Sequence, residues 1–263
     1  MNDKYEERLG TDRMLPLVFR MALPAVIAQI VNLLYNIVDR IYIGHIPGIG
    51  TQALAGIGVA GSLIILISAF SAIVAGGGAP LAAIALGQGN RTHAGKILGN
   101  GFVLLLFFTL LTSGLSYLFM EPILLFTGAS EQTLGYATAY LSIYLIGTLF
   151  VEVSVGLNTF INTQGRPGIA MLSIVIGALL NILLDPLFIF VFDWGVKGAA
   201  LATIISQACS AGWVLFFAAR ASLYEAGPEG CWSYIGVGSL TVYYGKYRKL
   251  GRICAERFIE DIR

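Results

Sequence analysis

The chain has 263 residues, of which 57% are hydrophobic and 12% are charged. A soluble domain usually carries about 25% charged residues, so this composition favours lipid over water as the surrounding solvent. The net charge of +1 gives neither a basic surface for nucleic acid nor an acidic surface for basic partners. We therefore expect an integral membrane protein that has no nucleic-acid partner.

Apolar stretches along the chain fit six membrane-spanning helices, because one span needs about 20 mainly apolar residues. Short segments rich in Gly, Pro and Asn separate these stretches and are typical of turns. The predicted spans are residues 14–44, 52–80, 95–119, 133–157, 168–192 and 197–220. The sequence therefore predicts an all-α integral membrane protein in which residues 14–221 form one six-helix bundle.

Polar segments flank the predicted bundle on both sides. Residues 1–13 are too polar for a secretory signal peptide, so the first span is expected to direct insertion itself. Residues 222–263 have a much higher charge density than the preceding chain, and their apolar run SYIGVGSLTVYYG is too short to span a bilayer. We interpret residues 222–263 as an atypical polar tail.

Lysine and arginine predict the orientation, because cytoplasmic loops are enriched in both residues. One side of the membrane would hold Lys4, Arg8, Arg13, Arg91, Lys96, Arg166 and Arg220, whereas the other would hold Lys197 and Arg40. We therefore expect a multi-pass protein of the inner (plasma) membrane, with its N-terminus in the cytoplasm.

Two acidic residues, Asp39 and Asp185, lie inside predicted spans in otherwise uncharged surroundings. An ionisable side chain within the membrane is costly, so a role in ion binding is the default interpretation. A structural ion pair is the alternative, and Arg40 gives it weight at Asp39. Both spans run outward and place the aspartates roughly 7–10 Å below the outer surface at 1.5 Å per residue. We predict that the two carboxylates share one hydrated pocket.

Two uncharged polar residues are predicted at a similar depth. Asn181 precedes Asp185 by one helical turn and so shares its helix face, and Thr203 lies early in the inward-running sixth span. Two carboxylates, an amide oxygen and a hydroxyl are hard oxygen ligands that suit Na⁺, or a network that carries a proton. Interhelical hydrogen bonding is the alternative role for Asn181 and Thr203.

Prolines mark candidate hinges. Pro186 follows Asp185 and cannot donate a backbone hydrogen bond, so the carbonyl of Ile182 loses its usual partner and becomes a candidate ion ligand. Pro24 in the first span and Pro80 at the end of the second would also kink their helices. For Pro80 an ordinary kink is the simpler interpretation.

Glu152 is the remaining acidic residue within a predicted span. The fourth span runs inward, which places Glu152 near the cytoplasmic end and at the wrong depth for the outer pocket. We interpret it as an interfacial or inward-facing residue, and a secondary role in a proton path is the alternative.

An enzyme is not expected. His45 and His93 fall on opposite sides of the membrane, and no nucleophile and base are predicted at matching depth. The glycines Gly56, Gly58 and Gly61 have the spacing of a dinucleotide-binding turn, but no β-α-β pattern surrounds them. Close helix packing explains these glycines better.

Four segments resemble multidrug and toxic compound extrusion transporters. LPAVIAQIVNLLYNIVDRIYIG is similar to their first helix, with Pro24, Gln29, Tyr35 and Asp39 matching in order. Three further segments are similar to later parts of the family: ALGQGNRTHAGKILGNG, NTFINTQGRPGIAM and NILLDPLFIFVFDWGVKGAALATIISQ. The last segment is the most specific, because it carries Asn181, Asp185 and Thr203 at the family's spacing.

The resemblance implies a prokaryotic member of the branch similar to DNA-damage-inducible transporters, which export amphiphilic or cationic compounds against Na⁺ or H⁺ entry. In that branch the matching residues form the cation site of the N-terminal lobe, and these are Asp39, Asn181, Asp185 and Thr203, with Tyr35 and Asn158 nearby. The implied partners are membrane lipid and a small amphiphilic or cationic substrate. No cofactor is expected besides the coupling ion.

Family members have about twelve helices in two six-helix lobes, and this sequence resembles the first lobe. The expected function is that of the N-terminal lobe of a cation-coupled multidrug efflux antiporter. A non-transporting fragment of a truncated or frameshifted transporter and a lipid-linked oligosaccharide flippase of the same superfamily are the alternatives. Export is expected to need a second lobe or a homodimer, because alternating access rocks one repeat against another.

Overall fold

The computed structural model describes residues 14–225, with side chains from 18 to 218. The predicted N-terminal segment 1–13 and residues 226–263 of the predicted tail 222–263 lie outside the described residues. The described chain forms helices α2 (Met14–Gly44), α3 (Gly50–Gly87), α4 (Arg91–Leu118), α5 (Met120–Phe126), α6 (Glu131–Thr163), α7 (Pro167–Pro186), a π-helical turn η1 (Leu187–Val191) and α8 (Gly195–Glu225).

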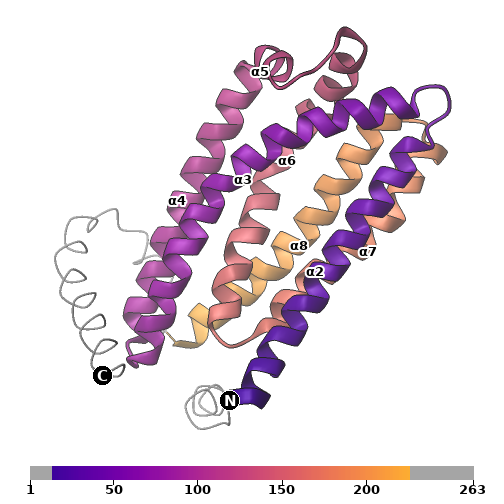
Figure 1. Ribbon diagram of the computed structural model, residues 1–263. Helices are drawn as coiled ribbons and strands as arrows, with labels where there is room; N and C mark the ends of the chain where they lie inside the picture. The colour runs from indigo at the N-terminus through magenta and orange to yellow at the C-terminus, as the bar shows by residue number, and fades with distance from the viewer. Residues whose placement is uncertain (1–13, 226–263) are drawn as a thin grey trace, which may run out of the picture.

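Six helical segments are long and apolar enough to cross a membrane: Val18–Gly44, Gly50–Gly87, Arg91–Leu118, Glu131–Thr163, Pro167–Val191 and Gly195–Ala218. This result confirms the predicted six-helix membrane fold. The start of α2 and the end of α8 lie at the same end of the bundle, as six alternating spans require (Figure 1).

The central helix of the bundle is α6. Its apolar window is 61% buried, compared with 6% for α2, and it packs against α3, α4 and α8. One apolar cluster around Leu63 and Leu141 joins α3 to α6, and a second around Leu105 and Leu157 joins α4 to α6. The helix α2 instead packs mainly against α7, which leaves most of its apolar surface exposed to lipid or to another helix.

The helix α3 runs seven residues beyond its predicted end at residue 80 and passes through Pro80 without ending. The ring of a proline meets the backbone carbonyl four residues earlier, here that of Gly76, yet α3 is continuous from Gly50 to Gly87. A Cβ atom at Gly78 would lie 2.7 Å from Cζ of Phe160 on α6. Gly78 therefore lets Phe160 of α6 pack closely against α3 just before Pro80.

The short helix α5 lies where the sequence predicted only a break between spans. Its residue Leu124 is fully buried at 0% exposure and belongs to the cluster around Leu141. The helix is seven residues long, which is too short for a helical repeat of apolar residues to be recognised in the sequence. Met120 and Ile123 also pack against this cluster, so the apolar side chains of α5 hold it on the bundle.

Candidate functional site

The side chain of Asp185 is completely buried near the end of α7, with 0% exposure. Asn181, one turn earlier, donates a hydrogen bond from Nδ2 to Oδ1 of Asp185 at 3.1 Å. The spacing of four residues places both side chains on one face of the helix. That face is directed towards α2 and α8, the two long helices that pack most extensively on α7.

Asp39 lies on α2, the helix that packs along α7. Its carboxyl group is within hydrogen-bond reach of the Asp185 carboxyl group when one of the two is protonated. Arg40 is next in the chain and is exposed, whereas Oδ1 of Asp39 is buried. The contact between α2 and α7 therefore brings together two carboxylates that are far apart in the sequence.

The third helix of the site is α8, which contributes Thr203. Its Oγ1 accepts a 3.4 Å hydrogen bond from Asn181 Nδ2 and donates to the carbonyl of Ala199 at 3.0 Å. The four residues Asp39, Asn181, Asp185 and Thr203 therefore form one group across α2, α7 and α8, which we call the carboxylate site.

Tyr140 on α6 also belongs to this neighbourhood, although no sequence motif indicated it. Its hydroxyl group lies close to the side chain of Thr203, and its ring stacks on Tyr144 with centroids 5.8 Å apart. Tyr140 is only 5% exposed. Its depth in the membrane could have indicated this position, because Tyr140 lies nine residues into α6, at a level similar to that of Thr203 in α8.

Tyr35 lies one turn before Asp39 on α2 and is partly buried. It is close enough to both aspartates for their charges to act on its hydroxyl group. The structure therefore places Tyr35 beside the carboxylate site, on the same face of α2 as Asp39.

Asn158 lies apart from the carboxylate site. Its Nδ2 donates a 2.8 Å hydrogen bond to Oγ of Ser173 on α7, and its Oδ1 lies 3.1 Å from the same hydroxyl oxygen. Ser173 precedes Asn181 by eight residues, which is about 12 Å along the helix. Nearby, Ser154 and Ser210 form a 2.8 Å hydrogen bond, and Ser210 donates to the carbonyl of Ser173. Asn158 is therefore part of a separate polar network that joins α6, α7 and α8.

The two candidate hinge prolines lie in different surroundings. Pro24 is inside α2, which continues as a helix on both sides of it. Pro186 ends α7 and is followed by the π-helical turn, in which Phe192 N donates to the carbonyl of Leu187 at 2.9 Å. A π-helical turn next to Asp185 is a local departure from regular helix, and such turns are frequent at functional sites.

Three acceptor oxygens of the carboxylate site are buried and have no hydrogen-bond partner: Asp39 Oδ1, Asn181 Oδ1 and Asp185 Oδ2. Buried oxygens of this kind are costly unless they are paired. A bound cation or a proton shared between the carboxyl groups would satisfy them. The group therefore has the chemistry of a small-cation site.

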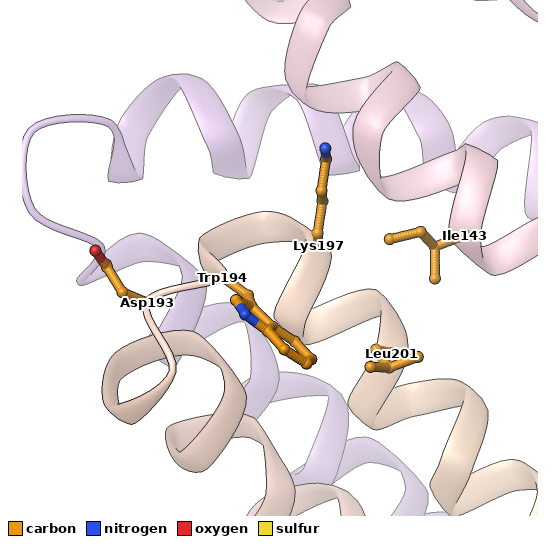
Figure 2. A pocket seen from close by; sticks show the side chains of 5 residues that line it. All are labelled: Ile143, Asp193, Trp194, Lys197 and Leu201. Atoms are coloured by element: carbon orange, nitrogen blue, oxygen red, sulfur yellow. The ribbon is translucent and has the colours of Figure 1, made fainter.

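An open cavity of about 460 Å³ lies between α6 and α8, close to the loop that precedes α8. Ile143 and Leu201 form its apolar walls, and Lys197 and Trp194 extend into it while the Asp193 carboxyl group points away (Figure 2). Leu201 is two residues from Thr203, and Ile143 is three residues from Tyr140. The cavity lies at the α7–α8 loop end of the bundle, and none of its lining residues belongs to the carboxylate site.

The fold and the site together define a multi-pass helical membrane protein with an oxygen-lined site buried between three helices. The MatE family model matches residues 24–187. The chain belongs to the MatE family, whose members are transporters. This membership agrees with the expectation that the protein is not an enzyme.

Several curated proteins resemble this chain over most of its length. It is 27% identical over 200 residues to the multidrug export protein MepA of Staphylococcus haemolyticus, covering 76% of this chain and 43% of that protein. It is 28% identical over 194 residues to an FAD transporter of Shewanella oneidensis, covering 72% of this chain and 42% of that protein. The chain thus spans less than half the length of these relatives.

Solved structures of MATE proteins share the fold. A crystal structure of MATE in complex with MaD5 matches with a TM-score of 0.71 and 26% identity, over 78% of this chain and 46% of that one. A crystal structure of MATE in the bent conformation matches with a TM-score of 0.68 and 26% identity, over 81% and 48%. The six-helix bundle therefore corresponds to about half of a MATE structure.

Proposed function

We propose that this chain forms the N-terminal lobe of a cation-coupled multidrug export transporter, of the branch similar to DNA-damage-inducible transporters. In this proposal the carboxylate site binds the coupling ion, Na⁺ or H⁺. The observation that carries the proposal is the set of three buried, unpartnered oxygens on Asp39, Asn181 and Asp185. They are supplied by two helices that meet only in the folded bundle.

The geometry supports coupling because the two carboxylates belong to different helices. When both are ionised, their charges repel at short range in a region of low dielectric constant. A bound Na⁺ or a shared proton removes this repulsion and favours close packing of α2 on α7. Occupancy of the site would therefore shift the equilibrium between two helix arrangements, which is the requirement for coupling.

The proposed substrate is a small amphiphilic or cationic compound. Multidrug export proteins among the relatives support this class, including a probable multidrug resistance protein of Bacillus subtilis that is 27% identical over 204 residues. We further propose that export needs a second six-helix unit, because transporters of this kind move one repeat against another around a central site.

Ion binding by the chain tests this proposal directly. Residues 1–263 are purified in detergent, and tryptophan fluorescence is recorded as Na⁺ concentration and pH are varied. Trp194 is 50% exposed and begins the turn into α8, so it reports on movement of that helix. We expect a saturable change that is lost in Asp185→Asn, because the amide keeps the shape of the side chain and removes its charge.

Glu131→Gln is the matched control, since Glu131 is an exposed acidic residue in the first turn of α6. It should keep the ion response of the unmodified chain. If the titration of Asp185→Asn is the same as that of Glu131→Gln, the carboxylate site does not bind the coupling ion.

A further inference from the structure

Glu152, which the sequence analysis interpreted as an interfacial or inward-facing residue, is buried in the interior of the bundle. It is 1% exposed on α6. Its Oε1 accepts a 2.7 Å hydrogen bond from Oγ of Ser68 on α3, whereas its Oε2 is buried with no hydrogen-bond partner. The position lies about 18 Å along α6 from Tyr140 at 1.5 Å per residue, so Glu152 is not part of the carboxylate site.

A second unpartnered polar atom lies at the same level of the bundle. Leu105 of α4 packs in the space beside Gly156 of α6, and the two helices are antiparallel (Figure 1). Thr109 lies one turn after Leu105 on α4, and Glu152 lies one turn before Gly156 on α6. Because the two helices are antiparallel, these steps lead in the same direction, so Thr109 and Glu152 lie at the same level. Thr109 is 2% exposed, and its hydroxyl group has no partner.

The level of Ser68 agrees with this register. The ring of Phe70 on α3 stacks on Phe108 of α4 with centroids 5.8 Å apart, which places Ser68 and Thr109 at neighbouring heights. The helices α3, α4 and α6 therefore share one polar layer inside an otherwise apolar packing region. In that layer a carboxyl oxygen and a hydroxyl group both lack partners.

Among the side chains that the structure describes, residues 18–218, the helices packed against α6 bring no opposite charge to this layer. Over residues 50–87, α3 has no titratable residue. The titratable side chains on the other packed elements are Arg91, His93, Lys96 and Tyr117 on α4, Glu121 on α5, Asp185 on α7, and Lys197 and Cys209 on α8; α6 itself adds Glu131, Tyr136, Tyr140 and Tyr144. Cys209 lies in the middle of α8, and Tyr144 is close enough to Glu152 for the charge of the carboxylate to act on its hydroxyl group, but neither residue is a cation. An ionised carboxylate without a counter-charge is costly at such a place.

We propose that Glu152, with Ser68 and Thr109, forms a second proton-binding site between α3, α4 and α6. One carboxylate and two hydroxyl groups offer few ligands for a hard metal ion, and Ca²⁺ for example takes about 6–8 oxygens. A proton needs one oxygen and removes the buried charge. The site lies towards the end of α6 at Thr163, the predicted cytoplasmic side, and stands apart from the proposed coupling site.

Infrared difference spectroscopy of the full 263-residue chain tests this site, because a protonated carboxyl group has a distinct C=O stretching band. The experiment uses the Asp39→Asn, Asp185→Asn double variant, so that failure of the carboxylate site does not affect the result. Spectra are compared between mildly acidic and mildly alkaline pH. We expect a pH-dependent carboxyl band that is lost when Glu152→Gln is added and kept when Glu131→Gln is added.

Ser68→Ala provides a second, independent readout, because it keeps the carboxyl group and removes its hydrogen-bond donor. The carboxyl band should shift in frequency, and this readout remains available if Glu152→Gln does not fold. A band that is unaffected by Glu152→Gln, or one that does not change with pH, would overturn the proposal. A band abolished by Na⁺ at constant pH would instead indicate a sodium site.

Discussion

The carboxyl groups of Asp39 on α2 and Asp185 on α7 lie within hydrogen-bond reach of one another, each with one buried oxygen that has no partner. The two residues come from the first and fifth spans, and no local sequence feature connects them. Their meeting depends on the packing of α2 along α7. If they hold one cation, their contributions to binding must depend on each other.

The first prediction is therefore non-additivity. Asp39→Asn and Asp185→Asn should each weaken ion binding at least about tenfold, which corresponds to about 1.4 kcal/mol. The double variant should be little worse than either single variant, because each change already removes the shared site. The measurement is the ion-dependent fluorescence titration of all four proteins. Additive losses would mean that the two carboxylates bind independently.

Asn158 provides a contrast, because its hydrogen bonds are to Ser173 and not to the carboxylate site. We expect Asn158→Ala to leave the ion affinity unchanged and to lower stability by about 1 kcal/mol, the usual size of a hydrogen-bond contribution. Ser173 Oγ keeps its 2.7 Å bond to the carbonyl of Ala170, which limits the loss. Thermal unfolding in detergent measures stability. A large loss of ion affinity in this variant would mean that Asn158 and the carboxylate site belong to one binding site.

Pro186→Ala tests whether the backbone next to Asp185 takes part in binding. Alanine restores an N–H group that can donate to the carbonyl of Ile182, one helical turn earlier. If that carbonyl is an ion ligand, the new hydrogen bond competes with the ion and the affinity should fall by roughly fivefold, or about 1 kcal/mol. Leu183→Ala is a suitable control, because Leu183 is on the same helix and is 68% exposed. Equal affinities in the two variants would exclude the carbonyl as a ligand.

The contact between α6 and α8 depends on one glycine. A Cβ atom at Gly147 would overlap the side chain of Ile204, so Gly147→Ala should destabilise the bundle by about 1–3 kcal/mol, the usual cost of overpacking. Gly135→Ala, on the same helix with open space around it, should be neutral or stabilising. Thermal unfolding of the two variants gives the comparison.

A compensating change checks the mechanism. Ile204→Ala removes the atoms that would be overlapped, so the double variant with Gly147→Ala should be less destabilised than the sum of the single changes. Full additivity would mean that Gly147 matters for another reason than contact with Ile204.

The sequence alone determined the class of the fold and the depth of the polar residues. Six spans follow from the length and apolarity of each segment, because a helix in lipid satisfies its own backbone and needs no partner to form. Depth follows from counting residues at a constant rise per residue. For that reason residue counting was enough to predict Asp39, Asp185 and Thr203 at one level of the membrane.

Tertiary structure decided which side chains share an interface at each level. Asn158 was implied to be near the carboxylate site, and Glu152 was expected to be interfacial or inward-facing. Packing pairs Asn158 with Ser173 and buries Glu152 against Ser68. Tyr140 joins Thr203 only because α6 and α8 are in contact. The rotation of a helix about its own axis depends on the helices packed against it. Counting residues along one segment therefore cannot predict which side chains face one another.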